Sequence, residues 1–231
     1  MTRTYSHLYS SLVHSLLDQI ADKTTPPESY KADMLKIGQI LGDALLSELE
    51  PSQSKVLLAA TAEDADFLAQ GILERLEAAI GSVAFACFWN YRTNLFDLDS
   101  LGSAPILKTY KEPIDQIDIL IIVKSVISGA CVVRTNLENL IQKIQPRKIL
   151  IVAPVLYHKA EETLKQSFAS SISDKFQFYY LAKDTEKSQN GDLVPGIGGR
   201  IYERLGFGGQ TEKNKYVPEI VKKRRAKFLP A

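Results

Sequence analysis

The chain has 231 residues, of which 28 are Lys or Arg and 27 are Asp or Glu, so its formal net charge is +1. This length suits one α/β domain, or one domain with an added cap. The balanced charge excludes a global field that would recruit nucleic acid or an anionic membrane. No apolar run approaches the length of a membrane span, and the first residues lack the apolar core of a signal peptide.

The two cysteines, Cys87 and Cys131, lie in apolar or small-residue contexts without Cys or His neighbours at metal-ligand spacing. We therefore expect reduced thiols in a cytoplasmic protein and no metal site. His7 and His14 lie seven positions apart on a predicted helix, where a surface or core-edge role is favoured over a metal role. Cys131 at a helix N-terminus is a candidate for a lowered pKa, although packing as a small thiol is favoured.

The chain begins with two predicted helices, after which the spacing of its apolar residues changes. Residues 5–21 and 29–49 place apolar side chains at helical spacing, on either side of a break that holds two prolines. They predict a helical cap over residues 1–50, before any strand. Residues 90–111 flank a turn at Leu101–Ser103 and predict an extended arm or β-hairpin.

Strands and helices then alternate through a predicted core over residues 51–209. Apolar, β-branched runs predict strands at 56–60, 83–88, 117–123, 149–153 and 176–181, with helices at 66–80, 131–144 and 159–168. This alternation is typical of a doubly wound parallel sheet. Such sheets bind ligands in the loops at the carboxyl ends of their strands, which here include the small-residue loop after Val123.

Three segments resemble the uracil phosphoribosyltransferase family, whose members have the type I phosphoribosyltransferase fold. The stretch Val123–Cys131 resembles the loop that binds phosphoribosyl pyrophosphate, and its equivalents here are Lys124, Ser125, Val126, Ile127, Ser128, Gly129, Ala130 and Cys131. The stretch after Asp192 resembles the family's uracil-recognition segment, whose equivalents are Val194, Pro195, Gly196, Ile197 and Gly198. In the arm, Tyr91 and Arg92 stand where the family also has Tyr-Arg. The resemblance covers about residues 8–209 and implies this α/β fold and a homodimer through the arm.

The departures from the family pattern affect the sites that contact phosphate. Lys124 stands where the family has an acid that holds the ribose hydroxyls, and Gly129-Ala130-Cys131 replaces a Thr-Gly-Gly turn. The pyrophosphate turn after the first strand reads Glu63, Asp64 and Ala65, and two carboxylates there would repel a pyrophosphate. Gly199 and Tyr202 replace two aspartates that serve the diphosphate and its metal.

These changes favour a divergent homologue that is catalytically impaired and binds a nucleobase, a nucleotide or a partner protein. The alternative is an active uracil phosphoribosyltransferase that makes UMP and pyrophosphate from uracil and phosphoribosyl pyrophosphate. Only in that case does the resemblance imply a cofactor, Mg²⁺, with Ile197 and Gly198 reading the base through their backbone.

Other candidates are weaker. The glycines at 196–199 and 206–209 do not follow a clear strand of a first βαβ unit, so a dinucleotide fingerprint is disfavoured. His158 follows a predicted strand end, where a surface position at a helix start is favoured over a cleft role. Residues 210–231 are rich in Lys and Arg and predict a basic, solvated tail, with docking to an acidic partner, nucleic acid or lipid as the alternative.

Overall fold

The computed structural model describes residues 3–49, 55–92, 104–114 and 116–227. All five predicted core strands form, and they pair in parallel in one sheet. They are β2 (Val56–Thr61), β3 (Ala84–Asn90), β5 (Ile119–Val123), β7 (Lys148–Tyr157) and β8 (Phe176–Asp184), in the spatial order β3-β2-β5-β7-β8. The expected α/β fold, with a largely parallel sheet flanked by helices, is therefore confirmed.

Shorter strands extend this sheet. The edge strands β1 (Arg3–Tyr5) and β4 (Ile106–Lys111) pair antiparallel with β8 and β3, while β6 (Val126–Ile127) pairs with the end of β7. Of the arm or hairpin predicted over residues 90–111, β4 is the second side, whereas most of the first side and the turn fall on residues 93–103, outside the described residues. A separate two-stranded ribbon joins β9 (Glu186–Lys187) to β10 (Leu193–Val194).

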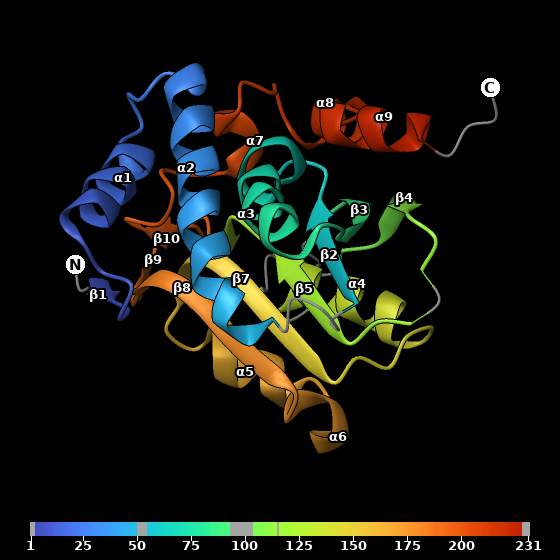
Figure 1. Ribbon diagram of the computed structural model, residues 1–231. Helices are drawn as coiled ribbons and strands as arrows, with labels where there is room; N and C mark the ends of the chain where they lie inside the picture. The colour runs from blue at the N-terminus through green and yellow to red at the C-terminus, as the bar shows by residue number, and fades with distance from the viewer. Residues whose placement is uncertain (1–2, 50–54, 93–103, 115, 228–231) are drawn as a thin grey trace.

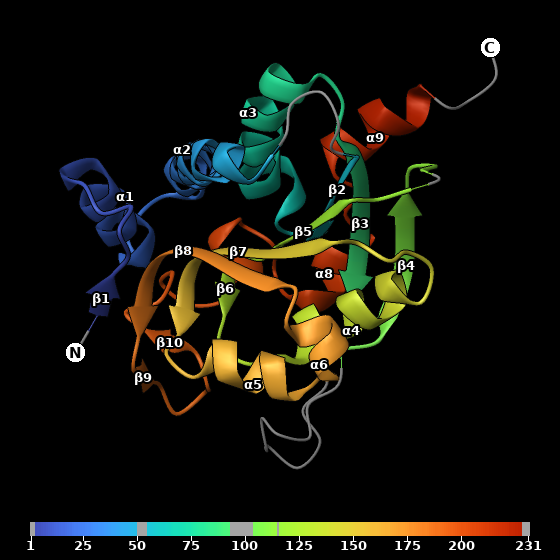
Figure 2. The same cartoon turned by 60° about the horizontal axis from the view of Figure 1, so that its bottom comes forward.

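Helices cover both faces of the sheet, so the molecule has three layers (Figures 1 and 2). One face packs against α1 (Ser11–Ala21), α2 (Pro27–Leu45) and α3 (Gln70–Ile80). The other packs against α4 (Cys131–Ile141) and α5 (Ala160–Gln166), and the short α6 (Ser170–Ser173) follows α5. The core strands are buried on both faces, which explains why they read as continuous apolar runs.

The two N-terminal helices form with different boundaries from those predicted, and a strand precedes them. Helix α1 begins at Ser11 because the Ser10 side chain accepts a hydrogen bond from the Val13 N–H, at 3.2 Å. The residues before it form β1 instead of a first helical turn. Helix α2 begins earlier than predicted, with Pro27 in its first turn, and is followed by the 3₁₀ turn η1 (Leu46–Glu48). None of the helices in the described ranges is long and apolar enough to cross a membrane.

The C-terminal region is not a solvated tail over residues 210–227. After α7 (Ile201–Arg204), the chain forms α8 (Gln210–Lys215) and α9 (Glu219–Ala226), which lie over one end of the sheet (Figure 1). Ile220 and Val221 are buried in the main core. Buried Arg224 pairs with Glu112 at 3.1 Å and with Glu77. The prediction was wrong because the apolar residues between the basic ones belong to packed helices.

Helices α2 and α3 approach closely through glycines. A Cβ atom added to Gly38 would lie 2.3 Å from the backbone oxygen of Leu68, and one added to Gly71 would lie 2.2 Å from that of Leu35. Both obstacles are backbone atoms, which cannot rotate away as a side chain can. The close contact holds the cap against the segment that carries Glu63 and Asp64.

We predict that Gly38→Ala destabilises the protein even though Ala is the better helix former. Overpacking at this contact should lower the free energy of unfolding by about 1 to 3 kcal/mol. Urea denaturation measures the change, with Lys36→Ala on the exposed side of α2 as the control. Equal stability of the Gly38→Ala and wild-type proteins would contradict the close contact.

Candidate ligand-binding site

The candidate site lies where the order of the strands reverses. From β2 the chain continues through α3 to β3, on one side, whereas from β5 it continues through α4 to β7, on the other. Open α/β sheets bind ligands at the carboxyl ends of the strands beside such a switch point. Ala60 of β2 pairs with Val123 of β5, so the loops after these strands start at the same level.

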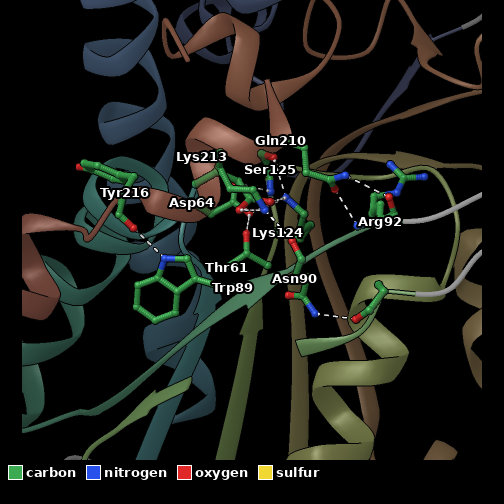
Figure 3. Close-up of polar contacts among 12 residues, drawn as sticks. Thr61, Asp64, Trp89, Asn90, Arg92, Lys124, Ser125, Gln210, Lys213 and Tyr216 are labelled. Atoms are coloured by element: carbon green, nitrogen blue, oxygen red, sulfur yellow. Dashed lines mark hydrogen bonds and ion pairs between the residues drawn. The ribbon is translucent and has the colours of Figure 1, made fainter. Parts of the chain in front are cut away.

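Two loop residues at this edge are joined by a buried ion pair (Figure 3). The Lys124 ammonium donates to Oδ2 of Asp64 at 2.6 Å, and the Asp64 side chain is fully buried. The Thr61 hydroxyl also donates to Oδ2 at 2.6 Å, and the Ser125 N–H donates to Oδ1 at 3.2 Å. Asp64 thus ties the end of β2 to the start of the loop after β5.

A second pair of charges lies beside the first. Glu63 Oε1 is 3.4 Å from the Lys124 Nζ, and Glu63 Oε2 is 3.5 Å from the Nζ of Lys213, on α8. Lys213 also donates to the backbone oxygen of Asn90 at 2.7 Å. Glu63, Asp64, Lys124 and Lys213 form what we call the switch-point cluster, whose formal charges sum to zero. The expectation that Glu63 and Asp64 repel a pyrophosphate was therefore wrong, because two lysines neutralise the two carboxylates.

Burial and charge compete at each of these groups. Burial alone would raise the pKa of Glu63, but Lys124 and Lys213 outweigh it and lower that pKa. Burial alone would lower the pKa of Lys124, but Asp64 and Glu63 outweigh it and raise that pKa. For Lys213 burial dominates, so its pKa is lowered despite the attraction of Glu63. The lowered pKa of Glu63 and the raised pKa of Lys124 keep both groups charged at neutral pH.

A cleft opens above the cluster and brings together several predicted segments. From the expected phosphate loop, Val126, Ser128, Gly129, Ala130 and Cys131 line it with Lys124. Ser125 and Ile127 are buried beneath the loop, and β6 fixes Val126 and Ile127 against β7. Glu63 lines the cleft, whereas Asp64 and Ala65 lie below it.

The predicted base-binding segment reaches the cleft through one residue of the five, Ile197. Val194 belongs to β10, a cis peptide bond joins it to Pro195, and a Cβ on Gly198 would meet the backbone oxygen of Ile20 at 2.7 Å. The cleft is lined instead by the residues that follow this segment, namely Gly199, Arg200, Ile201 and Tyr202.

The N-terminal strand holds this segment in place. Arg3 pairs with buried Asp184 through two hydrogen bonds of 2.7 Å, and it also donates to the backbone oxygen of Gly196 at 2.9 Å. Asp184 accepts a hydrogen bond from the Gly196 N–H at 2.8 Å. Residues far apart in the sequence therefore set the path of the chain before Ile197.

Among the remaining candidates, Arg92 lines the cleft, while Tyr91 is exposed and does not. Burial raises the pKa of Cys131, and Arg134 and Arg92 offset this only in part, so a lowered pKa is not found. His158 is exposed after β7 and its ring packs edge-on against that of Tyr157, as the surface interpretation expected. Within the described residues, no group of three His, Cys, Asp or Glu side chains is placed to hold a metal ion.

Sequence reasoning missed several cleft residues, among them Arg200 and Ile201 and three that make polar contacts within the protein. Asn90 ends β3, and its amide is buried and bonded to that of Asn136 at 2.9 Å. Gln210 exchanges hydrogen bonds with the backbone of Arg92, and Lys213 completes the cluster (Figure 3). The signal for Lys213 was the apolar residues of 216–221, which indicate a packed C-terminal region. In a packed region such a residue can face inward.

Comparison with known proteins supports the fold. No protein-family model matches the sequence, and no curated protein matches it. Among solved structures, the AQ2163 protein from Aquifex aeolicus is similar with a TM-score of 0.67 and 14% identity, over 87% of this chain and 97% of that chain. This likeness shows a shared fold.

Two looser likenesses have TM-scores below 0.5. A hypoxanthine phosphoribosyltransferase from Staphylococcus aureus has a TM-score of 0.42 and 12% identity, over 68% of this chain and 76% of that chain. A hypothetical protein from Neisseria gonorrhoeae with bound ppGpp has a TM-score of 0.39 and 10% identity, over 67% of this chain and 80% of that chain. Both are too loose to bear on ligand or activity.

We predict strong coupling between Asp64 and Lys124. Asp64→Asn or Lys124→Met alone leaves a buried charge without its partner and should cost about 3 to 5 kcal/mol in the free energy of unfolding. The double variant should cost clearly less than the sum, as measured by urea denaturation. Lys222→Met, in the exposed pair with Glu219, is the control and should cost about 0 to 1 kcal/mol. Additive costs at Asp64 and Lys124 would contradict the ion pair.

The lowered pKa of Glu63 predicts a pH dependence of stability. Its contribution should be fully present above about pH 4.3, the ordinary pKa of Glu in an unfolded chain. It should be lost as the pH falls through the lower pKa of the folded state. The stability difference between wild type and Glu63→Gln, measured by urea denaturation from pH 7 to pH 3, should therefore shrink. A difference that stays constant over this range would show that Glu63 is not stabilised by its charge.

Proposed function

We propose that the protein is a divergent, phosphoribosyltransferase-like binding protein. It holds a nucleobase or a nucleoside monophosphate in the switch-point cleft and does not transfer a phosphoribosyl group. The observation that carries this proposal is the buried pair of Asp64 and Lys124. By the family resemblance, position 124 holds the ribose hydroxyls and the turn at Glu63–Ala65 meets the pyrophosphate. Here these two positions bind each other.

Phosphoribosyl pyrophosphate has to break this pair or bind without its help. Separating a buried ion pair costs about 3 to 5 kcal/mol. Because each 1.4 kcal/mol is tenfold in affinity, this cost weakens binding by roughly two to three and a half orders of magnitude. The cluster is also neutral, so it offers no net attraction to a diphosphate.

The residues present do not fit the Mg²⁺ that the family resemblance implies for catalysis. Gly199 and Tyr202 line the cleft where that resemblance puts two aspartates, and neither offers a carboxylate. Glu63 and Asp64 do carry carboxylates, but each is already paired with a lysine. Asp192 in the lining supplies one further carboxylate, where the resemblance implies two aspartates. No step that requires the metal is assigned to this cleft.

The other cleft residues suit a flat, partly apolar ligand with a polar edge. Ile197, Ile201, Val126 and Val133 supply apolar walls, and Tyr202 supplies an aromatic ring. The cations of Arg92 and Arg200, also in the lining, are suited to an anionic group such as a 5′-phosphate. A nucleobase, alone or with one phosphate, combines these features.

Phosphoribosyl transfer to uracil is the second candidate. One observation favours it, namely that the expected phosphate loop and Ile197 of the expected base segment line the same cleft. Transfer would require the ribose, the 5′-phosphate and the departing pyrophosphate to be held together. The switch-point cluster argues against the first and third of these contacts.

Calorimetry with uracil, UMP and phosphoribosyl pyrophosphate tests the proposal, with Mg²⁺ present throughout. We expect uracil or UMP to bind, and phosphoribosyl pyrophosphate to bind at least about 100-fold more weakly, because of the pair that it must break. Incubation of all substrates with labelled uracil should give no UMP above a blank without protein.

Two results would contradict the proposal in different ways. Micromolar binding of phosphoribosyl pyrophosphate together with UMP formation would establish the transferase instead. Failure of uracil and UMP to bind, by a protein shown to be folded by circular dichroism, would exclude the nucleobase-binding role.

A further inference from the structure

We propose that Glu63 and Lys213 recognise the lactam edge of the ligand, which is a ring N–H beside a C=O. The Glu63 carboxylate accepts a hydrogen bond from the N–H, and the Lys213 ammonium donates one to the C=O. This inference rests on the proposed function and specifies which atoms of the nucleobase face the cluster. It assigns recognition to side chains of the loop after β2 and of the C-terminal helix α8. The backbone of residues 194–198, expected from sequence to read the base, is not needed for it.

The Glu63 carboxylate has an unused acceptor. Glu63 is 8% exposed and lines the cleft. Its Oε1 atom lies 3.4 Å from the Lys124 Nζ. Its buried Oε2 atom lies 3.5 Å from the Lys213 Nζ but accepts no hydrogen bond from any residue that the structure describes. A buried carboxylate oxygen without a donor is costly, so a ligand that brings an N–H to this atom gains a charge-assisted hydrogen bond.

The Lys213 ammonium has donors to spare at the same place. It is 2% exposed, lines the cleft, and gives one of its three N–H groups to the Asn90 backbone oxygen at 2.7 Å. Its 3.5 Å distance to Glu63 Oε2 is longer than a good hydrogen bond. A donor and an acceptor therefore lie side by side at the edge of the cleft, each with unused capacity.

The charges select a neutral ligand edge. An anion would be repelled by the Glu63 carboxylate, and a cation would be repelled by the ammonium groups of Lys124 and Lys213. A lactam presents an N–H and a C=O next to each other and carries no net charge. In uracil the N–H at ring position 3 has such a carbonyl on both sides, and it stays free when position 1 carries a ribose.

Lys213 is held in position before any ligand binds. The Trp89 indole N–H donates to the Tyr216 backbone oxygen at 2.7 Å, and the Tyr216 hydroxyl bonds to Asp66 (Figure 3 shows Trp89 and Tyr216). Asp66 also accepts the N–H groups of Glu219 and Ile220 at 2.8 Å each, at the start of α9. Preorganisation of this kind lowers the entropy cost of binding.

Methylated ligands test the inference on the wild-type protein, by calorimetry with uracil, 1-methyluracil and 1,3-dimethyluracil. We expect 1-methyluracil to bind like uracil, and 1,3-dimethyluracil to bind at least about tenfold more weakly, because its second methyl group removes the remaining ring N–H and leaves Glu63 without a donor from the ligand. Equal binding of all three would overturn the recognition pair while the proposed function stands. No binding of uracil, UMP or either methylated base would overturn both.

The variant Glu63→Gln provides an independent test, because it keeps the size of the side chain and removes its charge. We expect it to bind uracil about tenfold more weakly and inorganic pyrophosphate more tightly than wild type, since the cluster becomes net positive. Glu74→Gln on α3 lies outside the cleft lining and is the matched control. Unchanged uracil and pyrophosphate binding by a folded Glu63→Gln protein would overturn the inference, and the methylated ligands decide it if that variant does not fold.

Discussion

The buried ion pair between Asp64 and Lys124 is the constraint on which the cleft depends. The register of β2 and β5 brings the two loops to the same level, where a charge without a partner would be expensive. Asp64 satisfies Lys124, the Thr61 hydroxyl and the Ser125 N–H together. These contacts fix the start of the loop after β5, from which Val126 and residues 128–131 line the cleft.

The segment that carries this ion pair also contacts the C-terminal helices. Glu63, Asp64 and Asp66 lie within four residues, at the start of the π-helical turn η2 (Ala65–Ala69). The first two face the switch-point cluster, while Asp66 caps α9. One short segment thus connects the cleft floor to the helices that supply Lys213.

Much of the fold could be predicted from the sequence, and the partners within the site could not. Buried parallel strands such as 117–123 are continuous apolar runs, a local pattern that needs no knowledge of the rest of the chain. The position of the loop after Val123 at the sheet edge followed from the same pattern. Lys213 was missed because its neutralising role depends on Glu63, 150 positions earlier. Repulsion by Glu63 and Asp64 was inferred wrongly for the same reason, since spacing reveals a charge and not its partner.

The neutral cluster also explains how four charged side chains can be buried at the floor of the cleft. Groups that hold a diphosphate carry positive charge that the ligand neutralises, and without the ligand they repel one another. In this chain the carboxylates on the loop after β2 and the lysines on two other segments neutralise each other, so the buried charges need no ligand to balance them. The same pairing places a donor, Lys213, beside an acceptor, Glu63. The neutral polar edge that we propose for the ligand matches this arrangement, because such an edge adds no net charge to a cluster that is already balanced.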